Sequence, residues 1–188
     1  MVKHLEQNPK KEKEILEILR KVEQGDKKTI DKLNNLVKIC LDGQKKILAD
    51  LGIEYDFFDY ESKYLDKKRL NKILGDLKKT KRLKKDQENR LYLDQSKLEE
   101  NFEQKMKSAV LVLTRSDGTG LYVLRDILYT IDKLKSAPIN IIVLGEDQKL
   151  YFEQLSSCLK LLGYNVPRVV HYSFVLVKTK EGAKKMST

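Results

Sequence analysis

A phenol and a carboxylate stand four residues apart in the 188-residue chain, within the apolar, helically spaced segment Leu121–Leu134. Because residues four apart lie on one face of an α-helix, Tyr122 and Asp126 are expected to project together. A carboxylate can bind a planar guanidinium through paired hydrogen bonds. The residues alone also allow, and more often favour, a structural interpretation: Tyr122 packs in the core and Asp126 pairs with a neighbouring arginine.

A short polar segment, Gly145–Gln148, follows the apolar run at residues 139–145, which is predicted to be a strand. Open α/β sheets bind ligands at the carboxyl ends of their strands, and a glycine there permits close backbone approach. A strand-end turn with a solvated acid would give the same pattern. The last four residues, Lys185–Thr188 (KMST), would by themselves be equally consistent with a solvated tail.

Three motifs follow one another along the chain: Arg115–Ile127 (RSDGTGLYVLRDI), Gly145–Gln148 (GEDQ) and Lys185–Thr188 (KMST). Their order and spacing resemble the catalytic domain of the class I aminoacyl-tRNA synthetases, and specifically of the arginyl-tRNA synthetases. The segment Leu51–Ser62 (LGIEYDFFDYES) is also similar to this family. The resemblance implies an α/β fold, namely the second half of a Rossmann-like catalytic domain with parallel strands and crossover helices, ending at the KMS loop.

The resemblance assigns the amino-acid site to Tyr122, Asp126 and Gln148, with arginine as the expected substrate. In the implied reaction, the carboxylate of arginine attacks the α-phosphate of ATP. The resulting arginyl-adenylate then passes its arginyl group to the terminal ribose of its tRNA. No residue acts as a covalent nucleophile, so positioning and electrostatic stabilisation supply the rate.

The resemblance places ATP against the second and third motifs. Gly145 and Asp147 are expected to bind the nucleotide, with Asp147 accepting a hydrogen bond from a ribose hydroxyl. Lys185 and Ser187 are the expected catalytic residues, and Met186 lies between them on the same ATP-binding loop. The lysine would neutralise the departing pyrophosphate. Mg²⁺ is expected only as a counter-ion of the phosphates, with no protein metal site and no tightly bound cofactor.

One signature of the family is not found in these residues. Neither His4 nor His171 stands in a Pro-x-His-x-Gly-His context, so a HIGH motif is lacking. No anticodon-binding segment is recognised either. The sequence is therefore interpreted as an internal fragment that does not activate arginine by itself. A half-sheet of this kind is expected to leave an unpaired edge strand, through which copies could associate.

Charge density divides the chain into two parts. Residues 1–108 carry 27 Lys/Arg and 21 Asp/Glu, against 11 and 7 in residues 109–188. Such a high density leaves room only for narrow apolar stripes. We therefore predict a helix-rich, highly charged connective region over 1–108, and the C-terminal half of the nucleotide-binding fold over 109–188.

Apolar periodicity and glycine stops predict the individual elements. The connective region is expected to contain helices over 9–24, 28–51 and 62–77 and a β-hairpin at Leu83–Asp94. The second part is expected to alternate strands at Ala109–Thr114, 139–145 and Val169–Val177 with helices at Leu121–Leu134 and Leu150–Leu162. This alternation predicts a parallel unit whose β-branched strands are covered on both faces.

The net charge of +10 suits a polyanionic partner, here tRNA. Six cations in eight residues, Lys78–Lys85, are candidates for phosphate contacts, or else form a solvated helix end. Cys40 and Cys158 are expected to be buried free thiols in a reducing compartment. Without a signal peptide or a membrane-length apolar run, the protein is expected in the cytoplasm, away from membranes. Another class I synthetase and a non-catalytic basic RNA-binding module remain alternatives.

Overall fold

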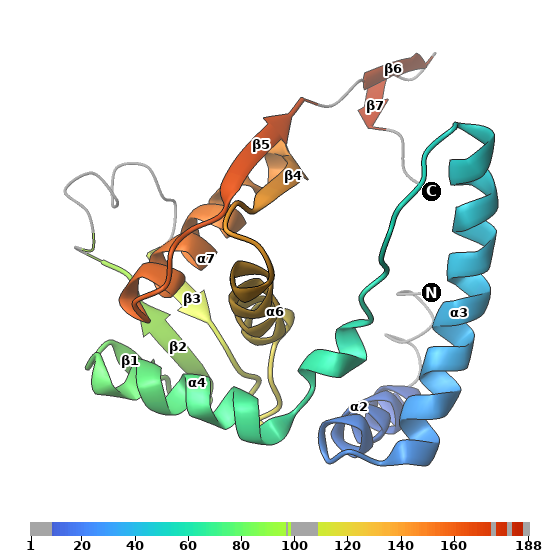
Figure 1. The fold of residues 1–188 in the computed structure, drawn as a ribbon. Helices are drawn as coiled ribbons and strands as arrows, with labels where there is room; N and C mark the ends of the chain where they lie inside the picture. The colour runs from blue at the N-terminus through green and yellow to red at the C-terminus, as the bar shows by residue number, and fades with distance from the viewer. Residues whose placement is uncertain (1–8, 97, 99–108, 174–175, 180–181, 186–188) are drawn as a thin grey trace. The chain divides into compact units, whose positions relative to one another are not determined.

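The computed structural model describes residues 9–96, 98, 109–173, 176–179 and 182–185 (Figure 1). The chain divides into two units, Met1–Ile73 and Leu74–Thr188. This boundary differs from the change in charge density at residue 108. The strands on the two sides of residue 108 pair with each other, so both belong to the second unit.

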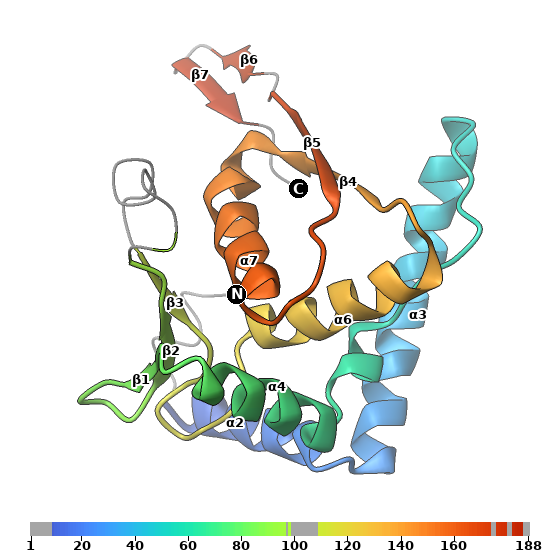
Figure 2. The same ribbon diagram turned by 60° about the vertical axis from the view of Figure 1, so that its left-hand side comes forward.

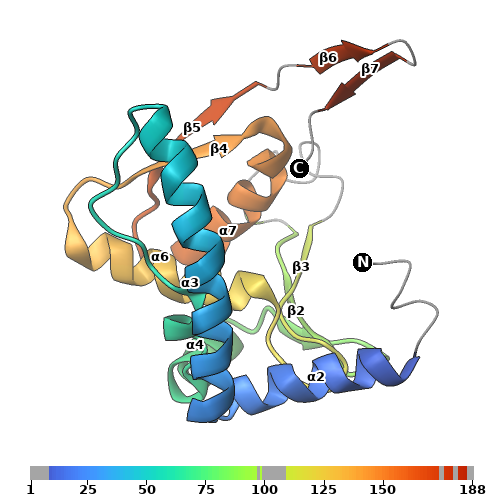
Figure 3. The ribbon, with the colours of Figure 1, turned by 90° about the vertical axis from the view of Figure 1, so that its right-hand side faces the viewer.

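Two helices form most of the first unit. They are α2 (Pro9–Glu23) and α3 (Lys27–Asp50), which meet at a tight turn (Figure 3). Gly25 has a φ of +81° in this turn, a conformation that favours glycine. The predicted first helix is therefore confirmed together with its glycine stop.

Both ends of α3 are defined by specific hydrogen bonds. Asp26 caps the start, because its carboxylate accepts a bond of 2.8 Å from the backbone N–H of Thr29. At the other end Gly52 has a φ of +68° and donates its N–H to the carbonyl of Ala49. This is the glycine-terminated ending that the sequence predicted.

The third predicted helix is two elements rather than one. A 3₁₀ turn, η1 (Glu61–Tyr64), is followed by the separate helix α4 (Lys67–Lys79). The carboxylate of Asp66 accepts bonds from the backbone N–H groups of Lys68 and Arg69, at 2.8 and 3.1 Å. The prediction of a single helix starting at Ser62 was wrong, because the Asp66 cap begins a new helix.

A three-stranded antiparallel sheet opens the second unit (Figure 1). It has the order β1 (Leu83–Lys85), β2 (Leu91–Asp94) and β3 (Val110–Val112), so the predicted hairpin is confirmed. β3 was expected in the parallel unit and instead pairs antiparallel with β2, with Leu111 opposite Leu93. Both leucines are buried, so β3 is stabilised by packing in the same core as the hairpin.

The parallel part of the fold is the pair β4 (Ile141–Gly145) and β5 (Arg168–Tyr172). Helix α7 (Lys149–Leu161) connects them and lies along the pair (Figure 2). This β–α–β arrangement confirms the predicted α/β class. The last strand was predicted to run to Val177 but ends at Tyr172, and a separate antiparallel hairpin follows, formed by β6 (Leu176–Thr179) and β7 (Gly182–Lys185).

The parallel pair is covered on one face only within the described residues. Alternate residues approach α7, as shown by the ring of His171, which stands edge-on to Phe152 at 6.2 Å. The residues between them face outward: Ile141 and Val143 are each 62% exposed. The prediction of burial on both faces was therefore wrong for this part of the chain. Among the described residues, neither β4 nor β5 has a further strand beside it.

The core of the second unit lies between the antiparallel sheet and the helices α6 (Tyr122–Ser136) and α7. Gln95, fully buried, donates its amide to the carbonyl of Gln154 on α7 at 2.7 Å. Gln154 in turn donates to the carbonyl of Val110 at 3.2 Å. These bonds join β2, β3 and α7.

The helices of the described ranges include none with the length and apolar character of a membrane span.

The two cysteines differ in their surroundings, although both are free thiols. Cys158 is fully buried on α7, and burial raises the pKa of its thiol to about 12. The prediction for this residue is confirmed. Cys40 is exposed on α3, a helix with no buried residue, so the prediction that it is buried was wrong.

Candidate functional site

Hydrogen bonds close the loop that precedes α6 and so define where this helix begins. Gly118 has a φ of +83° and donates its N–H to the carbonyl of Arg115, and Thr114 bridges to Gly120. The carboxylate of Asp117 accepts bonds from the N–H and the hydroxyl of Thr119, at 3.0 and 2.7 Å. Polar groups of the RSDGT segment (residues 115–119) thus form hydrogen bonds within the turn itself, and α6 begins three residues after Thr119, at Tyr122.

The guanidinium of Arg115 strengthens this turn from the side. It donates to the carbonyl of Gly120 at 3.0 Å and to the hydroxyl of Thr119 at 3.3 Å. The guanidinium of Arg125, on the first turns of α6, reaches the same Gly120 carbonyl at 3.3 Å. The loop and the start of the helix are therefore held as one piece.

A third residue, Tyr151, contacts both Tyr122 and Asp126. The hydroxyl of Tyr151, on the first turn of α7, donates a hydrogen bond of 2.5 Å to the Oδ2 atom of Asp126. The ring of Tyr151 also contacts the ring of Tyr122, with centroids 5.2 Å apart and planes tilted by 43°. A carboxylate and two aromatic rings thus form one cluster where α6 and α7 begin.

The members of this cluster differ in exposure. Tyr122 is 56% exposed, which excludes the interpretation that it packs in the core. Asp126 and Tyr151 are half-buried. Burial, and then the hydrogen bond to Asp126, raise the pKa of Tyr151 well above its usual range. The phenol is therefore protonated at neutral pH and donates its hydrogen bond to Asp126.

The second motif lies at the carboxyl end of β4. Gly145 is buried as the last residue of the strand and pairs with Tyr172 of β5. The short 3₁₀ turn η2 (Glu146–Gln148) follows, with Asp147 and Gln148 exposed. Gln148 occupies the N-cap position of α7, without a capping hydrogen bond from its side chain, and stands three residues before Tyr151, so both residues lie at the N-terminal end of α7. The roles of Gly145, Asp147 and Gln148 stay predictions.

The third motif is described only in part. Lys185 is the last residue of β7, and its backbone pairs with Leu176. Met186 and Ser187 lie outside the described residues, so their predicted roles are untested. Over the ranges that are described, no group of three or more His, Cys, Asp or Glu side chains is arranged to hold a metal ion.

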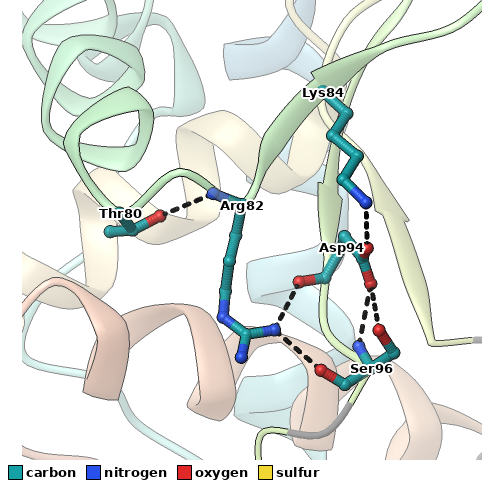
Figure 4. A network of polar contacts seen from close by, with 5 residues as sticks. All are labelled: Thr80, Arg82, Lys84, Asp94 and Ser96. Carbon is teal, nitrogen blue, oxygen red and sulfur yellow. Dashed lines mark hydrogen bonds and ion pairs between the residues drawn. The ribbon is translucent and has the colours of Figure 1, made fainter.

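The basic segment Lys78–Lys85 is partly engaged in structure (Figure 4). Arg82 donates to the carbonyl oxygens of Asp94 and Ser96, at 3.3 and 2.7 Å. Lys84 forms an ion pair with the carboxylate of Asp94, and Lys79 forms one with Asp76. Half of the predicted cluster thus stabilises the helix end and the hairpin.

One residue of the site was missed by the sequence analysis. Tyr151 was counted as part of an apolar helix, because it stands among Leu150, Phe152 and Leu155. The signal that could have found it is its place one helical turn after Gln148, in a helix expected to begin at the ligand-binding edge of the sheet.

The whole chain matches a known family, described as tRNA synthetases class I (R), catalytic domain, over residues 1–188. It is 39% identical to an arginine–tRNA ligase of Methanococcus aeolicus over 176 residues, covering 91% of the chain and 29% of the relative. It is 37% identical to an arginine–tRNA ligase of Methanocaldococcus jannaschii over 178 residues, covering 92% of the chain and 30% of the relative. The chain thus spans less than a third of the length of these relatives.

Solved structures share the fold. The Thermus thermophilus arginyl-tRNA synthetase superposes with a TM-score of 0.66 at 22% identity, covering 98% of this chain and 36% of that one. The arginyl-tRNA synthetase of Plasmodium falciparum gives a TM-score of 0.64 at 23% identity, covering 84% and 27% of the two chains. The chain therefore shares its fold with these solved structures.

Proposed function

Because the chain belongs to the family of class I tRNA synthetase catalytic domains, we propose that it supplies the arginine site and part of the ATP site of an arginine–tRNA ligase. Membership of this family implies the use of ATP. In the proposed reaction, the carboxylate of arginine attacks the α-phosphate of ATP, forming arginyl-adenylate and releasing pyrophosphate. The arginyl group is then transferred to the terminal ribose of the tRNA.

The observation that carries the proposal is the cluster at the start of α6. Asp126 is a carboxylate held at a defined place, and the exposed ring of Tyr122 stands on the same helical face. A guanidinium pairs with a carboxylate through parallel hydrogen bonds and stacks on aromatic rings. Both groups that recognise an arginine side chain are therefore present at one end of one helix, and Gln148 is proposed as a third contact.

The ATP side of the proposal follows from the carboxyl end of β4. Gly145 brings the backbone to this edge, and Asp147 follows it in an exposed turn. We assign Asp147 to a ribose hydroxyl, and Lys185, Met186 and Ser187 to the triphosphate, with Mg²⁺ arriving as the counter-ion of ATP. Charge stabilisation of the leaving pyrophosphate by Lys185 is then the main catalytic contribution of this chain.

The 188 residues contain no Pro-x-His-x-Gly-His sequence, so we propose that they do not activate arginine alone. The test uses two proteins: the chain itself, and a hybrid in which it replaces the matching segment of the Methanococcus aeolicus arginine–tRNA ligase. ATP–pyrophosphate exchange should require arginine in the hybrid and be undetectable in the chain alone. Exchange stimulated by another amino acid, but not by arginine, would contradict the proposal and favour another class I synthetase.

tRNA is the proposed macromolecular partner, which keeps the cytoplasm as the expected compartment. Lys78, Lys81 and Lys85 project from the basic segment and are not part of its ion pairs with Asp76 and Asp94. Their replacement by Gln should weaken tRNA binding by the hybrid and reduce its salt dependence, without changing the KM for arginine. If instead the chain binds tRNA with full affinity and the hybrid shows no arginine dependence, a basic RNA-binding module is the better description.

Self-association is proposed for the isolated chain, because β4 and β5 lack further neighbouring strands among the described residues and expose Ile141 and Val143. Size-exclusion chromatography with light scattering should show dimers or larger species at micromolar concentration. A strict monomer would contradict this part of the proposal.

A further inference from the structure

The start of α7 is tied to the start of α6 by one side chain that the function proposed above does not use. Tyr151 stands on the first turn of α7 and reaches Asp126, on the second turn of α6, through the 2.5 Å bond from its hydroxyl to Oδ2. Its ring contacts Tyr122 at 5.2 Å. Tyr151 therefore touches two of the three residues that are proposed to bind arginine, and it follows the third, Gln148, by one helical turn.

The bond constrains the orientation of the Asp126 carboxylate plane, which decides how the group can pair with a guanidinium. The terminal torsion of an aspartate is broad, so an unconstrained carboxylate rotates freely about its last bond. Bidentate pairing with a planar guanidinium requires one orientation of the carboxylate plane. An ionised carboxylate offers about four acceptor positions, so a phenol at Oδ2 orients the group without using up its capacity to bind a second donor.

The phenol also suits this task because it carries no charge. The pKa of Tyr151 lies far above neutral pH, first because the group is buried and then because it bonds to Asp126. A neutral donor fixes the carboxylate and leaves its negative charge in place, whereas a lysine or arginine at the same position would compete with the substrate.

We propose that Tyr151 is a positioning residue for arginine recognition, which sets the orientation of the Asp126 carboxylate and of the Tyr122 ring and so determines the preference for arginine over its uncharged analogue citrulline. The inference rests on the function proposed above. Tyr151 acts through Asp126 and Tyr122, so its loss affects the binding of the amino acid and leaves ATP binding intact.

The test is Tyr151→Phe in the hybrid enzyme, which removes one hydroxyl and keeps the ring beside Tyr122. We expect the KM for arginine to rise about 5- to 10-fold, the scale of one lost hydrogen bond that acts on the substrate only through Asp126. The KM for ATP should change less than twofold, and the preference for arginine over citrulline should fall several-fold. The matched control is Tyr164→Phe, since Tyr164 lies after α7 in the connection to β5 and its substitution should change none of these values.

A second measurement follows the bond in the chain itself. With the tyrosine rings labelled with ¹³C, Tyr151 should remain protonated at pH values where exposed tyrosines have lost their proton, and Asp126→Asn should lower its pKa. Titration of Tyr151 together with the exposed tyrosines would overturn the inference, as would an unchanged KM for arginine in Tyr151→Phe or an equal rise in both KM values. A hybrid with no arginine-dependent exchange would instead remove the proposed function and, with it, the substrate on which the inference rests.

Discussion

Two aspartates of the second unit each accept a hydrogen bond from a side chain, an ammonium group at Asp94 and a neutral phenol at Asp126. Asp94, on the hairpin, pairs with the ammonium group of Lys84 and accepts two bonds from Ser96, one from its N–H and one from its hydroxyl (Figure 4). Asp126, on α6, accepts the neutral hydroxyl of Tyr151. The bond from Lys84, followed by those from Ser96, holds the pKa of Asp94 well below its usual range.

The difference separates an acid that stabilises the hairpin from the acid that we propose binds arginine. The contacts around Asp94 close within residues 80–96, since Arg82 also binds the carbonyl oxygens of Asp94 and Ser96. The bond between Tyr151 and Asp126 instead spans 25 positions and lies beside a ring that is 56% exposed. A cationic partner offsets the charge of a carboxylate, whereas a phenol orients the carboxylate and leaves its charge for a substrate.

The largest predicted effect is the difference in kcat/KM between the Asp→Asn substitutions at Asp126 and at Asp94. Asp126→Asn in the hybrid should lower kcat/KM for arginine about 100-fold, or about 2.7 kcal/mol, because a neutral amide cannot pair with a guanidinium as a carboxylate does. Asp94→Asn should leave kcat/KM for arginine within twofold of the unmodified hybrid. Exchange assays at varied arginine concentration measure both values. Equal losses of kcat/KM in the two variants would contradict the proposal that Asp126, and not Asp94, binds arginine.

A smaller effect, on stability alone, is expected at the hairpin. Arg82→Met removes the guanidinium that binds two carbonyl oxygens and keeps much of the apolar stem. The free energy of unfolding of the chain should fall by about 2 kcal/mol, measured by urea denaturation. Lys85→Met is the matched control, because Lys85 is exposed on β1, and its replacement should change the free energy by less than about 0.5 kcal/mol. A similar loss in both variants would show that net charge, not the Arg82 bonds, is responsible.

The smallest effect concerns the pH dependence of the same region. The pKa of Asp94 is lowered in the folded chain, so its ionised form stabilises the fold above the unfolded pKa of about 4, and this contribution fades as the pH falls below that value. Asp94→Asn should therefore cost about 1 kcal/mol at pH 7, where solvent screens the Lys84 pair, and progressively less below pH 4. Urea unfolding of both chains from pH 7 to pH 2.5 measures the difference. A difference that grows on acidification would contradict the assignment of Asp94 as an ionised partner of Lys84.

Local features of the chain were predicted well from its sequence. Glycines at positions 25 and 52 end their helices in the left-handed conformation, and the hairpin at Leu83–Asp94 forms where its polar tip indicated. The position of Asp126 one turn after Tyr122 also follows from helical spacing. These features depend on neighbours within a few residues, which a sequence displays directly.

Most of the errors concern contacts between distant segments. The run at Ala109–Thr114 has the same apolar character whether it pairs with a hairpin or with a parallel strand, and its pairing with β2 depends on which leucines share a core. The outward face of β4 has as many β-branched residues as a buried strand would have, so composition could not reveal that Ile141 and Val143 are exposed. The start of α4 at Lys67 is a local exception, because it required recognising Asp66 as a helix cap for residues two and three positions away.

By itself, the sequence determined which residues are available for chemistry and the order in which they occur, because helix spacing, glycine turns and motif order are properties of the chain. The tertiary structure alone decided how Asp126 is held, since Tyr151 is 25 positions away and reaches it only when α6 and α7 pack with their first turns together. A hydrogen bond over such a separation depends on the burial of two helices in one core, and no local pattern encodes it.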